Sequence, residues 1–315
     1  MTYAIDPELG AVLAGLAAGE GPVIDDWRSL RVAGEGGQGW YGQQVPAWPA
    51  GYPTVEAQTW QVGADEGAVL RARWVTRKGH SPGSAVVFAH GGGMVLGTID
   101  LWDPLVAGYV AATGVPFLSV GYRLAPEVGG QTPARDMYAA LRYLHSHAGE
   151  YGVDPDRIAI MGESSGGGLA AAVSLLARED RLPVAAQLLV SPMLDDRTTT
   201  APSCIEPFLT WTSATNRIGW TALLGERVGT EDVSAVEAPA RAGDLQGLPP
   251  AYVEVGELDL FRDETVRYAL RLMEHQVPVE LHVHTGVNHG FERAVPTAQV
   301  AQRVFADRHR YLSGL

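Results

Sequence analysis

Short apolar runs alternate with helical patterns from about residue 56 to the end of the chain, and this alternation limits the fold more than any other feature. The apolar runs that we expect to form strands are 57–63, 69–75, 85–89, 115–120, 158–161, 185–190, 251–255 and 279–283. Helical patterns lie near 101–112, 133–147, 164–178, 264–274 and 297–311. Most of the runs are continuously apolar, as is typical of parallel strands buried on both faces.

This order of elements predicts an α/β fold with a mostly parallel eight-stranded sheet and helices on both faces. The first two strands resemble a hairpin and are expected to join the sheet as an antiparallel edge. Residues 1–55 are rich in Gly, Pro and Trp and show one short helical stretch. Residues 195–245 break the alternation, and their length and Pro/Trp content indicate an insertion over the functional site. Such sites lie at the carboxyl ends of the strands.

Charge and hydropathy exclude several classes of partner. The chain of 315 residues carries 23 basic and 36 acidic residues, a net charge of −13. This acidity repels phosphate backbones and anionic lipid, so we expect no nucleic-acid partner. No run of about 18 apolar residues occurs, so no membrane span is predicted. Asp6 and Glu8 precede the apolar stretch 9–18 where a signal peptide would be basic, so we expect none.

Cofactor and metal sites also find little support. The single cysteine, Cys204, cannot form an intramolecular disulfide or a thiolate cluster, and it fits a cytoplasmic protein. The single lysine, Lys78, follows no glycine, so there is no nucleotide-binding P-loop. Lys78 lies in a polar stretch, which would not lower the pKa of its amine as a Schiff-base lysine requires. We predict that the protein needs no cofactor.

Three other patterns could be mistaken for ligand sites. Gly34-x-Gly36-x-x-Gly39 has dinucleotide-site spacing, but it follows no strand and opens no helix, so we interpret it as a flexible loop. The pair Asp195-Asp196 could bind a metal, although a solvated turn is favoured. His282 and His284 could also bind a metal, but we favour the interpretation that they are partly exposed strand residues or form a subunit contact.

The pentapeptide 162–166, Gly-Glu-Ser-Ser-Gly, follows an expected strand and opens an expected helix. This Gly-x-Ser-x-Gly pattern in a strand–turn–helix context predicts that Ser164 is a nucleophile raised on a strained turn. Glycines on either side remove side chains that would collide with neighbouring backbone. An incidental serine in a Gly-rich turn is the alternative. Ser165 is a rival nucleophile but lacks the flanking-glycine register.

The tetrapeptide 90–93, His-Gly-Gly-Gly, follows the expected strand 85–89. Ester hydrolysis passes through an oxyanion, which backbone N–H groups can stabilise. We expect the N–H groups of Gly92, Gly93 and Ser165 to converge on it, and His90 to hold the loop by a hydrogen bond. A phosphate-binding loop is the alternative, and it is disfavoured because the run begins with histidine and lacks lysine.

A serine nucleophile needs a base and an orienting acid. Of nine histidines, His289 lies just past the last expected strand, in Asn-His-Gly-Phe. Asp259 follows the strand 251–255 at its carboxyl end, with Glu257 as the second candidate acid. Asp263 is expected to cap the following helix. The order Ser164, Asp259, His289 is the nucleophile–acid–histidine order of α/β-hydrolases.

These motifs together resemble those of the hormone-sensitive lipase family of α/β-hydrolases, and within it the bacterial carboxylesterases of the heroin-esterase type. The matching motifs, in family order, are His-Gly-Gly-Gly at 90–93 with Gly97, Tyr-Arg-Leu-Ala-Pro-Glu at 122–127, the elbow at 162–167, Asp259-x-x-x-Asp263 and His-Gly-Phe at 289–291. They cover about residues 85–291.

The resemblance implies Ser164 as nucleophile, Asp259 as acid and His289 as base. It likewise implies oxyanion donors at Gly92, Gly93 and Ser165, and often a dimer. It further implies a helical cap formed by an N-terminal segment, residues 1–55, and by an insertion at about 195–245 in a catalytic domain of residues 56–315.

Four positions depart from the family pattern. Glu163 stands where Asp or Thr is usual, and Ser165 stands where Ala is usual, although its N–H remains. Leu260 replaces a common proline. Met94 replaces an aromatic residue and is expected to widen or soften the acyl pocket. These departures affect substrate preference rather than reaction type.

The predicted function is therefore a serine carboxylesterase for small, fairly apolar, short-chain esters, with a small-molecule substrate as its partner. We expect Met94, Phe208 and Trp211 to line the substrate pocket. Trp27, Trp40 and Trp48 could also do so, or could pack the cap on the body. An amidase, lactonase or acyltransferase would use the same triad. A non-enzymatic ligand-binding protein is disfavoured because all three triad residues are present.

Overall fold

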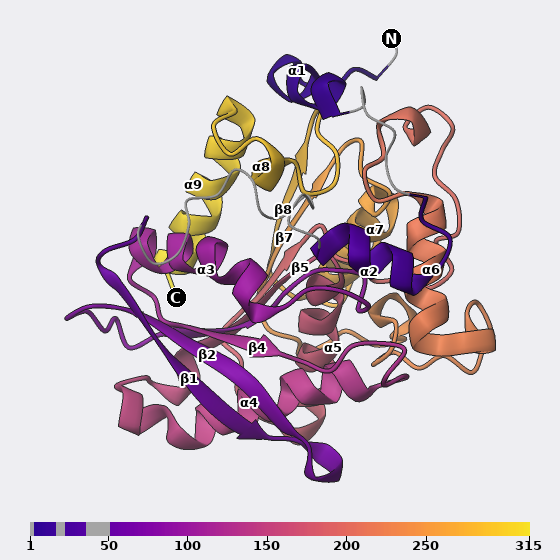
Figure 1. Ribbon diagram of the computed structural model, residues 1–315. Helices are drawn as coiled ribbons and strands as arrows, with labels where there is room; N and C mark the ends of the chain where they lie inside the picture. The colour runs from indigo at the N-terminus through magenta and orange to yellow at the C-terminus, as the bar shows by residue number, and fades with distance from the viewer. Residues whose placement is uncertain (1–2, 17–22, 36–50) are drawn as a thin grey trace.

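A computed structural model describes residues 3–16, 23–35 and 51–315, and its centre is one eight-stranded sheet (Figure 1). The strands are ordered β1-β2-β4-β3-β5-β6-β7-β8 across the sheet. Their bounds are β1 Val55–Gly63, β2 Val69–Arg77, β3 Ala85–Ala89, β4 Phe117–Gly121, β5 Ile158–Glu163, β6 Gln187–Val190, β7 Ala251–Gly256 and β8 Val279–His284. Strand β2 pairs antiparallel with both β1 and β4, whereas all other neighbours are parallel. The expected antiparallel edge and parallel body are thus confirmed.

Helices cover both faces of the sheet (Figure 1). Their bounds are α1 Pro7–Leu16, α2 Trp27–Glu35, α3 Ile99–Thr113, α4 Thr132–His147, α5 Ser165–Asp180, α6 Ser213–Leu224, α7 Arg262–Glu274, α8 Phe291–Ala294 and α9 Gln299–Ser313. Side chains of α3 and α9 share a core with one face of the sheet, and those of α4, α5 and α7 share a core with the other.

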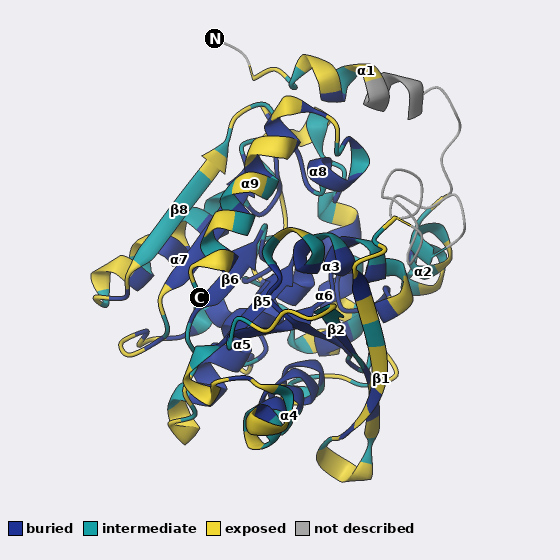
Figure 2. Cartoon of the chain, turned by 90° about the vertical axis from the view of Figure 1, so that its left-hand side faces the viewer, coloured by how far each residue is buried: buried dark blue, intermediate teal, exposed yellow. Residues whose placement is uncertain are grey.

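Strand β5 shows why the central runs are continuously apolar. Every residue of β5 is buried. Ile158 and Ile160 belong to the core beside α4 and α5, while Ala159 and Met161 belong to the core beside α3. Successive side chains of a strand point to opposite faces, so a strand with a core on each side needs apolar residues at both parities. The dark interior of Figure 2 is this doubly covered sheet.

The N-terminal segment differs from the expectation of one short helical stretch, because it forms two helices, α1 and α2. Gly34 of the supposed loop is part of α2, whereas residues 36–39 lie outside the described residues, as do Trp40 and Trp48. Trp27 is partly buried and contacts the guanidinium groups of Arg28 and Arg31, at 4.4 and 4.7 Å from its ring centre.

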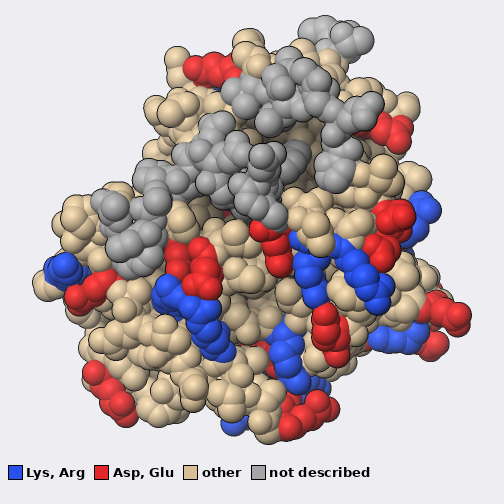
Figure 3. All heavy atoms as spheres, in the orientation of Figure 1, with Lys and Arg blue, Asp and Glu red and all other residues tan. Residues whose placement is uncertain are grey.

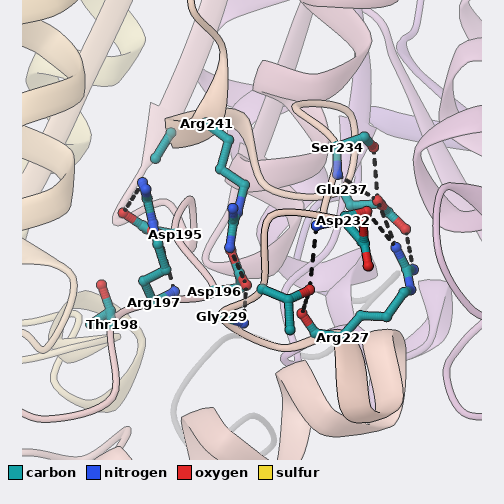
Figure 4. Close-up of polar contacts among 12 residues, drawn as sticks. Asp195, Asp196, Arg197, Thr198, Arg227, Gly229, Asp232, Ser234, Glu237 and Arg241 are labelled. Carbon is teal, nitrogen blue, oxygen red and sulfur yellow. Dashed lines mark hydrogen bonds and ion pairs between the residues drawn. The ribbon is translucent and has the colours of Figure 1, made fainter.

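The segment between β6 and β7 contains a buried ion pair between Asp196 and Arg241. The expectation that Asp195-Asp196 forms a solvated turn is therefore wrong for Asp196. Asp196 is 1% exposed; its two oxygens accept from Arg241 Nε at 2.6 Å and Nη2 at 2.9 Å, and one also accepts from the N–H of Gly229 at 2.6 Å. Figure 4 shows these partners reaching one carboxylate from separate stretches of the insertion. Asp195 instead pairs with the half-exposed Arg197.

Surface charges are mixed on the face drawn in Figure 3, where lysine and arginine side chains lie beside acidic ones. Among the described residues, no helix is both long and apolar enough to span a bilayer.

Candidate active site

Ser164 occupies the tight turn between β5 and α5, with φ 57° and ψ −122°. The left-handed φ is strained for a residue with a side chain, and such strain is concentrated at functional sites. A Cβ on Gly162 would lie 2.0 Å from the Gly166 carbonyl oxygen, and one on Gly166 would lie 2.1 Å from that of Ala89. Both flanking glycines are therefore required by the turn. The N-terminus of α5 points its dipole toward the hydroxyl.

The structure brings Ser164, His289 and Asp259 together in one buried hydrogen-bonded line. His289 Nε2 lies 2.9 Å from Ser164 Oγ, and its Nδ1 lies 2.7 Å from Asp259 Oδ2. With Nδ1–H donating to the carboxylate, Nε2 is free to accept the serine proton. Asp259 is fully buried, and its other oxygen accepts the N–H of Phe261 at 2.9 Å. This geometry fits a general base with its orienting acid.

Two further contacts hold His289, one at its imidazole and one at its backbone carbonyl. The ring of Phe261 stands edge-on to His289, with centroids 5.2 Å apart and planes at 84°. Thr210 Oγ1 donates to the His289 carbonyl at 2.8 Å. Neither contact was found from the sequence, since a loop 79 residues away leaves no local signal.

The other acidic candidates lie elsewhere. Glu257 accepts the N–H of Gly286 at 3.0 Å. The capping prediction for Asp263 is wrong: the helix begins at Arg262, two residues before the expected Glu264, so Asp263 lies in its first turn and pairs with Arg262. His282 pairs with Glu280. No group of three or more potential metal ligands occurs among the described residues.

The glycine loop lies against the nucleophile. A Cβ on Gly91 would be 3.1 Å from Ser164 Cβ. Gly92 and Gly93 have φ 129° and 59°, values that favour glycine. In the part of the chain that the structure describes, no hydrogen bond occupies the N–H groups of Gly92, Gly93 or Ser165. Backbone N–H groups of this kind are the donors that a developing oxyanion requires.

His90 holds this loop, as expected. Its Nδ1–H donates to the Gly91 carbonyl at 2.9 Å, and its ring stacks on Tyr122 at 4.3 Å. Tyr122 Oη donates to the His90 carbonyl at 2.8 Å. Burial lowers the pKa of His90 to about 4, so the imidazole is neutral near pH 7.

Of the three expected pocket residues, Trp211 has its ring near the triad histidine. Its ring centre is 6.5 Å from that of His289, and a Cβ on Gly93 would lie 2.5 Å from its Cη2. Trp211 Nε1 donates to Asn216 Oδ1 at 3.2 Å, a partner that the sequence did not reveal. Buried Met94, with φ 63°, follows the glycine loop.

Phe208 approaches the site through its backbone. Its carbonyl accepts from Asn288 Nδ2 at 3.0 Å, next to the histidine, and its side chain is partly buried. The segment from Phe208 to Trp211 thus brings the insertion onto the histidine loop.

Comparisons with known proteins agree with this geometry. Residues 86–293 match a family described as alpha/beta hydrolase fold. The carboxylesterase NlhH of Mycobacterium tuberculosis is 37% identical over 228 residues, which are 69% of this chain and 70% of NlhH. Esterase LipI of the same organism is 36% identical over 212 residues, 65% of either chain, so slightly under two thirds of its length is matched. The solved structure "Bacterial Heroin Esterase" superposes with a TM-score of 0.88 and 36% identity, covering 98% of this chain and 97% of that one.

Proposed function

This chain belongs to the alpha/beta hydrolase fold family, and we propose that it is a serine carboxylesterase that hydrolyses small, fairly apolar, short-chain esters. The observation that carries the proposal is the hydrogen-bonded line from Ser164 Oγ through His289 to the buried Asp259 carboxylate. Relatives named esterase and carboxylesterase, and the esterase fold neighbour, support the same reaction class.

In this mechanism Ser164 Oγ attacks the acyl carbon while His289 Nε2 takes its proton. The new oxyanion accepts hydrogen bonds from the glycine loop and from the N–H of Ser165. His289 then gives its proton to the leaving alcohol, and water attacks the acyl-enzyme by the same route. Asp259 stays ionised throughout and stabilises the imidazolium.

We infer that the substrate pocket is bounded by Trp211, Met94 and Phe208, beneath a cap made by the N-terminal segment and the insertion. Trp211 supports this because its ring lies between the glycine loop and the histidine ring. A large fixed ring so close to the reacting atoms limits the length of the acyl chain. We also infer a cytoplasmic location and a dimer, which cell fractionation and sedimentation velocity would test.

The decisive experiment is Ser164→Ala, assayed on p-nitrophenyl acetate. We expect kcat to fall by at least about three orders of magnitude, because single triad deletions in serine hydrolases cost on the order of 10⁴–10⁶. Ser165→Ala is the matched control, because it keeps the backbone N–H and should leave kcat within a few-fold. An unchanged kcat for Ser164→Ala would reject the mechanism.

An amidase, lactonase or acyltransferase would share the acyl-enzyme and is the competing class. Rates on matched esters and amides, with and without an alcohol acceptor, separate these activities. For the esters themselves, we expect the rate along a series of p-nitrophenyl esters to peak at short acyl chains. A maximum at palmitate would contradict the pocket that we infer.

A further inference from the structure

A buried arginine on the C-terminal helix α9 contacts carboxylates from three distant parts of the chain. Arg308 is 1% exposed. Its Nε lies 2.9 Å from Glu254 Oε1, its Nη2 lies 3.0 Å from Glu292 Oε1, and its Nη1 lies 3.5 Å from Glu163 Oε1. All three carboxylates are at most 3% exposed. One guanidinium thus joins three acidic side chains away from water.

Each of these carboxylates belongs to the segment that carries one member of the triad. Glu163 is the last residue of β5 and directly precedes the nucleophile. Glu254 lies on β7, which leads into the loop of the acid. Glu292 lies in the first turn of α8, three residues after the histidine. Arg308 therefore links all three triad-bearing segments.

A second arginine and two tyrosines join the cluster, and Arg293 Nε lies 3.6 Å from Glu163 Oε2. Tyr109 Oη, from α3, donates to Glu163 Oε1 at 3.1 Å and accepts from Arg308 Nη1 at 2.8 Å. Tyr252 Oη donates to Glu254 Oε2 at 2.5 Å. Burial raises the pKa of Glu163. Burial acts most strongly on Glu254 and in the same direction, but the charge of Arg308 and the hydrogen bonds from Arg308 and His284 together outweigh it and lower the pKa of Glu254 to about 2.

Stability alone does not account for such a cluster. Replacing a buried ion network by apolar side chains is often neutral or stabilising, because desolvation offsets the Coulomb attraction. A guanidinium, however, presents five donors in a rigid planar fork and so fixes the directions of its partners. Displacement of reacting groups by about 1 Å can cost about a hundredfold in rate.

We propose that Arg308 is a positioning residue that sets the relative placement of the nucleophile, acid and base segments through Glu163, Glu254 and Glu292. This inference rests on the proposed function, since it concerns the same triad. It assigns a role in catalysis to the C-terminal helix, which touches none of the reacting atoms.

The test replaces Arg308 by lysine, which keeps the charge but loses the fork. The readouts are the rate at which a fluorophosphonate labels Ser164, and kcat and KM for p-nitrophenyl acetate, all per folded molecule. We expect the labelling rate and kcat to fall at least about tenfold while KM stays within about twofold. Arg303→Lys, at an exposed position of the same helix, is the matched control and should change nothing.

A purely structural role predicts a different result. Arg308→Lys would then lower the melting temperature but leave the labelling rate of the folded protein unchanged, and that outcome overturns the proposal. If Arg308→Lys does not fold, Glu163→Gln decides: it keeps the size and the acceptor for Tyr109 but removes the charge that faces Arg308 and Arg293. Slower labelling supports the proposal, and labelling at the wild-type rate overturns it.

Two features of the design separate this inference from the proposed function. Labelling reports activation of Ser164 without any ester, so a wild-type protein that labels but hydrolyses no ester rejects only the proposed function. In the double variant Glu163→Gln/Arg308→Lys, the two rate losses should combine to less than their product, because both single variants weaken the same Arg308–Glu163 contact. Fully multiplicative losses would overturn the link between them.

Discussion

At the scale of single residues, Gly93 is the position where backbone and side-chain constraints meet. Its φ of 59° is a left-handed value, and such a conformation costs an L-residue roughly 1–2 kcal/mol. Its missing Cβ also leaves room for the Trp211 ring, which would otherwise be 2.5 Å away. The loop that offers N–H groups to the oxyanion and the ring that bounds the pocket therefore depend on the same glycine.

We expect Gly93→Ala to lower kcat about a hundredfold, since displacing one oxyanion donor costs on the order of 10²–10³ in rate. Steady-state kinetics on p-nitrophenyl acetate measures this. Gly79→Ala is the control, because Gly79 has a similar φ of 67° but nothing within 4 Å of an added Cβ. It should lose stability and keep kcat.

Trp211→Phe offers a rescue of that variant, because phenylalanine lacks the Cη2 atom that crowds residue 93. We expect the double variant Gly93→Ala/Trp211→Phe to be faster than Gly93→Ala alone. If both variants were equally slow, crowding by Trp211 would not be the cause.

Residue-scale prediction from sequence succeeded where the chemistry is local. Ser164 sits in a pentapeptide whose glycines the turn requires, and the histidine and acid each follow a strand end, so sequence analysis could choose the three side chains that the structure brings together. Arg308 carries no such signal. It lies 145 residues from Glu163, and no spacing rule relates two residues that meet only through the packing of a C-terminal helix.

At the scale of elements, the apolar strands were predictable from sequence, whereas a one-turn helix and the start of an uncapped helix were not. All eight strands appear where continuous or alternating apolar runs indicated them, because a doubly covered sheet imposes that composition. The four residues of α8 are too few to show a period. Helix α7 begins at Arg262 without a side-chain cap, so the expectation of a cap at Asp263 missed its start by two residues.

The segment between β6 and β7 contains a buried ion pair, Asp196–Arg241. We expect Asp196→Ala to destabilise the protein by about 3–5 kcal/mol, because it leaves the buried Arg241 guanidinium unpaired. Arg197→Gln is the matched control: it breaks the neighbouring half-exposed pair with Asp195 and should cost about 0–1 kcal/mol. Urea unfolding measures both. Equal losses in the two variants would show that burial of the Asp196 pair is unimportant.

At the scale of the whole molecule, the pKa values of buried carboxyl groups are shifted in opposite directions, so their effects on stability change with pH in opposite ways. Burial raises the pKa of Glu264 to about 8, although the N–H of Leu194 and the hydroxyl of Thr198 donate to it. Burial also raises the pKa of Asp103 to about 6, against the charge of Arg73. Glu254 is shifted the other way, to about 2, despite its burial.

The signs of these shifts predict where the folded state is most stable. A carboxyl group whose pKa is higher in the folded than in the unfolded protein stabilises the fold fully at pH values below its unfolded pKa. That contribution is lost as the pH rises through its folded pKa. Ionisation of Asp103 and Glu264 therefore lowers the free energy of unfolding as the pH rises from about 4 to about 8. Glu254 contributes stability above about pH 4.5, which is lost as the pH falls toward 2. The net charge of −13 at pH 7 also shrinks as carboxylates protonate.

We therefore expect the free energy of unfolding in urea to be largest near about pH 5 and to fall toward pH 8. Glu264→Gln should remove up to about 1.4 kcal/mol per pH unit of that fall, because an amide does not ionise. Glu274→Gln, at an exposed position of the same helix, should leave the slope unchanged. A wild-type stability that increased from pH 5 to 8 would contradict the assignment of Glu264 as a buried, protonated carboxyl.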